Sequence, residues 1–331
     1  MPRKVRLHEA RDEYGQMLKL RVKPVTYKTA WCVVKNFVNV AGDIYASNLQ
    51  PKHVEAWLGA NSDSWKPATK QMYVARIGHF QRWLKSRGYI DPLTDIIEDF
   101  RHLKTSRGQQ LFVPSSRFDE LLDVAERQCA RDRALVALGL YSLVRRSEMI
   151  NIRWGDIEER ISIYRTKTDD VDSLPISKYL EPELNRWRSH LCRLLQITAP
   201  DPRWPVICAL QNKDPRAASD ETYVPDRAFM NPGRRVWTAL TTLGYTDKGL
   251  GTHTLRRSGA HAMLDELIEK GVGQDMALII VKEMLGHADV SMTMTYLNWR
   301  AHRRKRDEIV ANLGSDAVPS HDNKVVQLRA G

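Results

Sequence analysis

Residues 285–296 read LGHADVSMTMTY, so that Tyr296 follows His287 by nine positions. Two basic groups precede this stretch along the chain. One is His253-Thr254-Leu255-Arg256, which has the form of a helix start, and the other is Arg145-Arg146-Ser147-Glu148, which closes an apolar run. A phenol can attack phosphorus, and arginine and histidine can hold a phosphate while it does so. The order arginine, His-x-x-Arg, histidine, tyrosine therefore points to chemistry on a phosphodiester.

These groups resemble the sequence boxes of the tyrosine recombinases of the phage-integrase family. The family's first box, roughly Thr-Gly-Leu-Arg-x-Ser-Glu, corresponds to residues 142–148, and its His-x-Leu-Arg-His-Thr box corresponds to residues 253–258. Its Leu-Gly-His box and its tyrosine correspond to residues 285–287 and 296. The family lysine, which lies in a β-hairpin, corresponds to Lys167 in Thr166-Lys167-Thr168. The resemblance covers the chain from about residue 7 to residue 313. Each box alone is a weak signal, but all of them in this order and at this spacing are specific.

The resemblance implies a site-specific recombinase or integrase that cleaves and rejoins double-stranded DNA through a 3′-phosphotyrosyl bond. Tyr296 is then the nucleophile, His253 an acid–base group and His287 a hydrogen-bonding partner of the scissile phosphate. Lys167 protonates the leaving 5′-hydroxyl, with Lys178 as a rival. No cofactor and no metal ion are implied, and the family assembles as a homotetramer on its DNA site. The implied catalytic set is Arg145, Lys167, His253, Arg256, His287 and Tyr296.

Two arginines from distant segments suit this chemistry. In-line displacement at a phosphodiester adds charge to the non-bridging oxygens, and a guanidinium fork binds two of them. Arg145 stands three residues before Glu148, which is placed to orient it or to form a buried structural pair with it. An ordinary tyrosine has a pKa of about 10, so Tyr296 needs a base or a cationic environment.

The neighbouring arginines are expected to matter much less. Arg146 occupies the variable position of the first box. Arg256 lies three residues after His253, on the same helix face, whereas Arg257 points roughly 100° away.

The composition agrees with a polyanionic partner. The chain has 331 residues, a net charge of +11 and a pI of about 9.5. The four cysteines are widely spaced and form no Cys-x-x-Cys pair, so we expect buried free thiols rather than disulfides or zinc ligands. An apolar run of about 18 residues is absent, and so is a secretory signal at the start. We therefore expect a cytoplasmic protein.

We expect two domains. Residues 1–101 show helical periodicity and predict a helical bundle, which the resemblance identifies as a core-binding domain that clamps DNA. Lys28 and Lys70 are its candidate phosphate contacts. A polar, basic linker is expected at 102–115, a catalytic domain at 116–313 and a flexible tail at 314–331.

The catalytic domain is expected to be mainly helical with a small β-sheet, an α+β arrangement. Ser116 and Asp119 resemble a capping box for a helix to about Arg127, and residues 131–143 predict a buried helix. Alternation at 161–164 and an apolar group at 174–176 predict a hairpin, followed by helices from 179 and a loop-rich interval at 199–225.

Three features depart from the family pattern or bear on assembly. Leu143 stands where the first box usually has glycine, so the local turn is expected to differ. Few residues precede the first helix, so we expect no separate arm-site domain. After Tyr296, a basic segment carrying Ile309, Val310 and Leu313 is expected to dock on a neighbouring protomer or on its own domain.

Two other functions remain compatible with these residues. A type IB topoisomerase uses the same chemistry but rejoins the original strand, relaxing supercoils. A DNA-binding protein of this fold without catalysis is the other alternative. The presence of every polar position together with Tyr296 favours an enzyme, and the Leu-Gly-His box and modest length favour the recombinase.

Overall fold

The computed structural model describes residues 3–101, 111–166, 168–211, 222–247, 249–297 and 310. The chain divides into two compact units, residues 1–109 and 110–331, each with its own hydrophobic core. The division falls inside the interval expected to be a linker. None of the helices in the described ranges is both long and apolar enough to cross a membrane.

All the regular elements in the described part of the first unit are helices or 3₁₀ turns. A proline occupies the first turn of α2, α3 and α4, where its missing N–H has no intrahelical partner to lose. Trp57 is fully buried between Phe37 and Trp65, and its Nε1 donates to Asn36 Oδ1 at 2.6 Å. The elements are α1 (Leu7–Arg21), α2 (Pro24–Ala41), η1 (Ala46–Asn48), α3 (Pro51–Ala60), α4 (Pro67–Ser86) and η2 (Glu98–Phe100).

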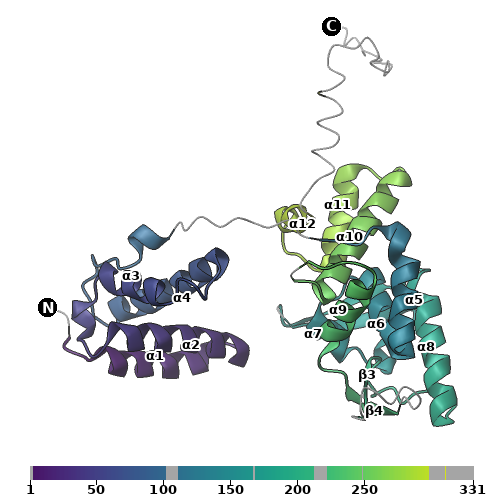
Figure 1. The fold of residues 1–331 in the computed structure, drawn as a ribbon, viewed down its shortest axis with the longest axis horizontal. Helices are drawn as coiled ribbons and strands as arrows, with labels where there is room; N and C mark the ends of the chain where they lie inside the picture. Colours follow the sequence, from purple (N-terminus) through teal and green to yellow (C-terminus); the bar gives the residue numbers. More distant parts are fainter. Residues whose placement is uncertain are drawn as a thin grey trace, which may run out of the picture. The chain divides into compact units, whose positions relative to one another are not determined.

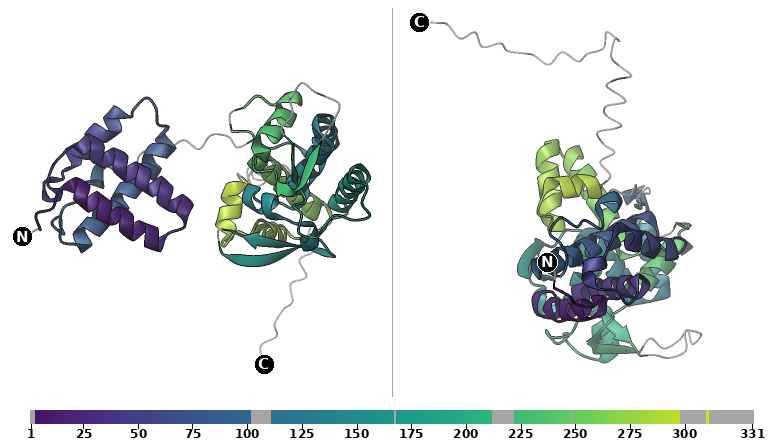
Figure 2. Two further views of the ribbon diagram at one scale, coloured as in Figure 1. Left: turned by 90° about the horizontal axis from the view of Figure 1, so that it is seen from below. Right: turned by 90° about the vertical axis from the view of Figure 1, so that its left-hand side faces the viewer.

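The second unit is mainly helical with two small antiparallel sheets. Helix α6 is buried along most of its length and packs against α5, α8, α9 and α10. Figures 1 and 2 show α11 and α12 at one end of this unit and β3 and β4 at the other. The helices are α5 (Phe118–Gln128), α6 (Ala130–Tyr141), α7 (Arg146–Asn151), α8 (Leu180–Leu195), α9 (Pro232–Thr242), α10 (Thr252–Glu269), α11 (Gln274–Leu285) and α12 (Val290–Tyr296), with 3₁₀ turns η3 (Ser115–Arg117) and η4 (Trp154–Asp156).

The expected hairpin is formed by β1 (Arg160–Arg165) and β2 (Asp170–Pro175), with Ile161 opposite Leu174. Alternate residues of β1 are buried, as the alternating sequence predicted. A second sheet is formed by β3 (Cys208–Leu210), which lies inside the interval expected to be loop-rich, and β4 (Tyr223–Ala228), which begins within that interval and extends beyond it.

Two local expectations were wrong. Helix α5 begins at Phe118 after Arg117, with no side-chain cap, because Ser116 belongs to the preceding 3₁₀ turn. The cysteines are free, as expected, but only Cys129 and Cys208 are buried, whereas Cys32 is exposed and Cys192 half-buried.

Candidate functional site

The first arginine box forms the start of α7. Arg145 is the N-cap residue, and its main-chain N–H donates to Glu148 Oε2 at 2.6 Å. Its side-chain Nη1 donates to Glu148 Oε1 at 2.8 Å, and Nη2 donates to the carbonyl of Gly286 at 3.2 Å. Glu148 is buried. The carboxylate therefore orients Arg145 and is at the same time a buried structural partner.

The turn before α7 is left-handed at Leu143, with φ of +54°. This is the position where the family box usually has glycine, and here a leucine adopts that backbone at a cost of roughly 1–2 kcal/mol. Its side chain is fully buried. A Cβ on Gly259 of α10 would lie 2.6 Å from that side chain and 1.7 Å from the Leu140 carbonyl oxygen. Only glycine at 259 lets α10 approach this turn closely.

Arg256 lies on α10 and is 2% exposed. Its guanidinium donates to the main-chain carbonyls of Leu143 and Leu285 and lies 3.8 Å from Glu148 Oε2. Burial lowers the pKa of Arg256 to about 10, so it remains protonated at neutral pH. The left-handed turn and the Leu-Gly-His segment thus hold Arg256 beside Arg145.

Arg165, at the end of β1, also belongs to this cluster, although it was not among the residues predicted from the sequence. It is buried, and its Nη1 donates to Glu148 Oε2 at 3.2 Å while Nη2 donates to Asp172 Oδ2 at 2.8 Å. A Cβ on Gly286 would lie 2.8 Å from its guanidinium carbon, and Gly286 has a φ of +57°. Glycine is therefore required at position 286 for two reasons: the backbone is left-handed there, and a side chain would collide with Arg165. An arginine at an inward position of an alternating strand was the available signal.

Helix α12 explains the nine-residue spacing between His287 and Tyr296. Asp289 caps the helix by accepting from the Ser291 N–H at 2.6 Å. His287 Nδ1 and the buried Thr293 Oγ1 are 3.0 Å apart, and Tyr296 lies three residues further along the same face. The rings of His287 and Tyr296 meet edge to face, with centroids 5.5 Å apart.

The phenol of Tyr296 reaches the His-x-x-Arg helix. Its Oη donates to the main-chain carbonyl of His253 at 3.4 Å. Burial raises the pKa of Tyr296, while the positive charges of Arg256, Arg257 and Arg145 oppose that rise. Desolvation lowers the pKa of the His253 imidazole, and the same three arginines lower it further. The His253 imidazole and the Tyr296 phenol are therefore both neutral at pH 7.

The guanidinium groups of Arg145, Arg165 and Arg256 converge on Glu148, and that of Arg257 lies over the Tyr296 ring. In the described part of the chain the carboxylates paired with them are Glu148 and Asp172. The arrangement leaves positive charge in excess, partly removed from water, where an anion is bound strongly.

Four lysines were considered from the sequence, and the described residues place none of them in this cluster. Lys167 lies outside the described residues, between β1 and β2. Lys178, its rival, sits 4.9 Å over the ring of Tyr179. Lys28 is exposed on α2, and Lys70 is half-buried in the first turn of α4, both in the first unit.

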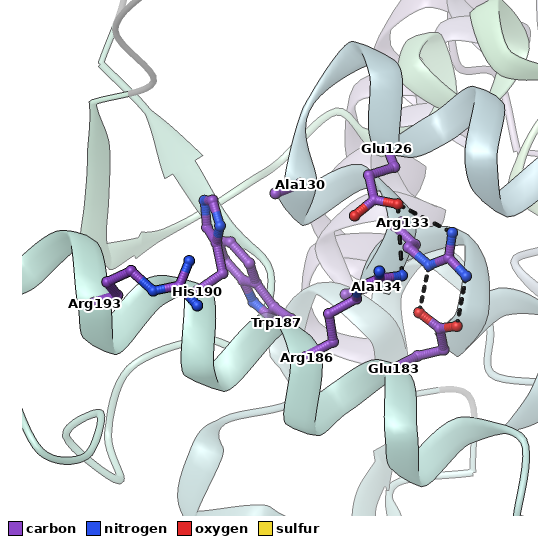
Figure 3. Close-up of a pocket in the computed structure, with 9 residues that line it drawn as sticks. All are labelled: Glu126, Ala130, Arg133, Ala134, Glu183, Arg186, Trp187, His190 and Arg193. Atoms are coloured by element: carbon purple, nitrogen blue, oxygen red, sulfur yellow. Dashed lines mark hydrogen bonds and ion pairs between the residues drawn. The ribbon is translucent and has the colours of Figure 1, made fainter.

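A second charged cluster in the same unit serves as a contrast (Figure 3). Arg133 donates from Nε and Nη2 to both oxygens of Glu183, and from Nη1 to Asp123 and Glu126. These carboxylates raise its pKa. Because its donors are taken up by carboxylates, this cluster is built to hold α5, α6 and α8 together rather than to bind an anion.

Comparison with known proteins agrees with this geometry. The profile of the phage integrase family matches residues 112–303, more than half of the chain. The chain belongs to the phage integrase family. It is a tyrosine site-specific recombinase. The described residues of the site all lie within the matched region.

Individual relatives are distant. The tyrosine recombinase XerD of Lacticaseibacillus casei is 25% identical over 256 residues, which make up 73% of this chain and 76% of that protein. A lambda integrase dimer bound to a COC′ core site has a TM-score of 0.67 at 18% identity, covering 89% of this chain and 77% of that one. XerH bound to a palindromic difH substrate, in a post-cleavage complex, has a TM-score of 0.63 at 16% identity, covering 87% and 80%. At such identities the structural likeness establishes the fold.

Proposed function

We propose that this recombinase cleaves a strand of double-stranded DNA by attack of Tyr296 Oη on phosphorus. The P–Oη bond forms as the P–O5′ bond breaks, which leaves a 3′-phosphotyrosyl link and a free 5′-hydroxyl. Arg145 and Arg256 bind the non-bridging oxygens, where charge develops. Attack by a 5′-hydroxyl from a second duplex then reverses the step and exchanges strands.

Two histidines and a lysine take the remaining roles, which are proton transfer and hydrogen bonding to the phosphate. The neutral His253 imidazole accepts the proton of the Tyr296 phenol, whose raised pKa keeps it protonated at pH 7. His287, oriented by Thr293, donates a hydrogen bond to the phosphate. Lys167 is our candidate for protonating the leaving 5′-oxygen.

The observation that carries this proposal is the 3.4 Å separation between Tyr296 Oη and the His253 carbonyl oxygen, beside the buried Arg256. We would test it with a library of nicked duplexes of random sequence, in which the short fragment after the cleavage position is lost on cleavage. A recombinase accumulates a protein–DNA adduct that survives denaturation. Sequencing the DNA in this adduct identifies the preferred substrate, which we call the selected nicked duplex. Absence of any adduct would leave a DNA-binding protein of this fold.

A second arm of that experiment separates recombination from relaxation. Two plasmid sites carrying the selected sequence should yield exchanged products. Relaxation of a supercoiled plasmid without exchange would favour the topoisomerase alternative.

We propose that catalysis needs no metal ion, because fixed guanidinium groups already supply the positive charge that the phosphate requires. Adduct formation on the selected nicked duplex should be unchanged in excess EDTA. A rate restored only by added Mg²⁺ would contradict this.

The helical first unit is proposed to be a core-binding domain that, with the second unit, clamps the duplex. Lys28 and Lys70 are its candidate phosphate contacts. Each alanine variant should reduce the slope of log K against log salt by about 0.9, because one fewer counterion is released. An unchanged slope in both variants would remove these two lysines from the interface.

We further propose that the protein acts as a homotetramer on DNA, since exchange between two duplexes needs four active sites. A lambda integrase tetramer bound to a Holliday junction has a TM-score of 0.62 to this chain at 18% identity. Apart from Val310, the segment expected to connect protomers, with Ile309 and Leu313, lies outside the described residues. Truncation after Arg306 should leave binding to one site intact and abolish exchange. Exchange by the truncated chain at the full-length rate would refute this.

A further inference from the structure

Arg257 lies directly over the proposed nucleophile. Its guanidinium carbon is 5.1 Å from the centroid of the Tyr296 ring. The side chain is half-buried, and its Nε has no hydrogen-bond partner among the described residues. The arginine of the structural cluster, Arg133, is instead surrounded by carboxylates. The charge of Arg257 is therefore directed at an aromatic face.

The other end of Arg257 is fixed by the segment that opens the second unit. Its Nη1 donates to the main-chain carbonyl of Leu111 at 3.0 Å. Phe112 stacks on His261 of α10 with centroids 4.1 Å apart, and the Val113 N–H donates to Ser258 Oγ at 2.8 Å. Three successive residues are thus anchored to α10, and the first of them holds the guanidinium in place.

A cation over a tyrosine ring acts differently on the two protonation states. It is attracted to the electron-rich face of the neutral ring and fixes the ring's orientation. When the phenol ionises, the ring and oxygen gain negative charge, and the attraction to a partly desolvated cation increases. The same contact therefore orients the nucleophile and favours its reactive form.

We propose that Arg257 is a positioning residue for Tyr296, held by the Leu111 carbonyl so that its charge lies over the ring and favours the ionised nucleophile. This rests on the proposed role of Tyr296 as nucleophile. It replaces the expectation from helical spacing that Arg257 contributes little. Arg257 acts through Tyr296 and does not itself bind the phosphate.

The test compares two variants on the selected nicked duplex. Arg257→Gln keeps a donor for the Leu111 carbonyl but loses the charge, and Arg257→Lys keeps the charge. The rate of adduct formation is measured between pH 6.5 and 10, together with the salt dependence of DNA binding and the Tm. Should the glutamine variant be insoluble, Arg257→Met supplies a neutral side chain suited to a half-buried site.

The neutral variant should be roughly three- to thirtyfold slower at pH 7, the range expected for losing a cation–π contact. That difference should shrink towards pH 10, where more of the phenol ionises without help, and the lysine variant should recover most of the rate. The salt slope of binding should not change.

Three results would overturn the proposal. They are a neutral variant as fast as wild type, a deficit of the same size at every pH, and a fall of about 0.9 in the salt slope, which would mark Arg257 as a phosphate ligand. Failure of the wild-type protein itself to form an adduct would instead reject the proposed function.

Discussion

Tyr296 Oη on α12 lies 3.4 Å from the main-chain carbonyl oxygen of His253 on α10, although the two residues are 43 positions apart. The contact brings the candidate nucleophile to the helix that carries Arg256. Arg145, Arg165 and His287 come from the same unit of the same chain. The described part of the site is therefore assembled within one chain, so variants of that chain test it directly.

Loss of either arginine that we propose to bind the phosphate should slow cleavage far more than it weakens DNA binding. Arg145→Ala and Arg256→Ala are each expected to reduce adduct formation by roughly 10²-fold or more, the scale for removing one preorganised transition-state contact. Arg146→Ala, at an exposed position of α7, is the matched control and should retain near wild-type rates. An inactive Arg146 variant beside an active Arg145 variant would show that the register of the first box is wrong.

The left-handed backbone at Leu143 predicts an unusual order of stability. Leu143→Ala removes a buried side chain and keeps the unfavourable φ, at a cost of about 2–5 kcal/mol. Leu143→Gly loses the same side chain but relieves the backbone, so it should be the more stable of the two by roughly 0.5–1 kcal/mol.

Leu184, buried within α8, supplies the control for that order. The free energy of unfolding of Leu184→Ala should exceed that of Leu184→Gly by about 1 kcal/mol, as in ordinary helices. Urea unfolding measures the free energy of unfolding of the alanine and glycine variants at both positions. The same order at both positions would mean that Leu143 carries no strain.

Close approach of α10 to the turn at Leu143 makes Gly259 intolerant of a methyl group. Gly259→Ala would place Cβ 1.7 Å from the Leu140 carbonyl oxygen, so α10 must shift, at a cost of at least about 2 kcal/mol. Gly233→Ala, in α9 with open space around the position, should change stability by less than about 1 kcal/mol. Thermal unfolding of both variants checks this, and equal Tm values would contradict the packing described.

The lowered pKa of His253, the proposed base, should determine where the reaction rate falls at acid pH. A base must be neutral to accept the phenol's proton, and a depressed pKa keeps it neutral to lower pH than an ordinary histidine. The second-order rate of adduct formation, which reports groups of the free enzyme, should thus hold at pH 7 and fall only below about 6.5. His253→Gln should lower the rate and remove this fall. His253 would be excluded as the base if the fall in rate had its midpoint above pH 6.5, or if the glutamine variant showed the same fall at acid pH.

The sequence predicted the parts of this molecule that depend on local pattern. The resemblance to the family supplied the arginine and histidine boxes, and spacing selected Arg145 and Arg256 within them. Alternation identified the β1–β2 hairpin, because it reflects which face a side chain occupies. The interval containing β3 and β4 has no clear alternation, and the pairing of these strands depends on tertiary contacts.

The parts of the site that were missed depend on packing between distant segments. Helical spacing correctly separates Arg257 from Arg256 on α10, but it cannot reveal that α12 returns to place Tyr296 under Arg257. Likewise, Leu143 was recognised as a departure from glycine, yet its left-handed φ follows from a buried side chain and a carbonyl that binds Arg256. Such features become visible only when the elements are assembled.

The most direct measurement is identification of the residue that carries DNA in the covalent adduct. Wild-type protein trapped on the selected nicked duplex is digested, and the DNA-linked peptide is sequenced by mass spectrometry. We predict a 3′-phosphate ester on Tyr296, and a Tyr296→Phe variant that binds the same duplex but forms no adduct. A modified peptide containing Tyr245 or any other residue, or an adduct formed by the phenylalanine variant, would contradict it.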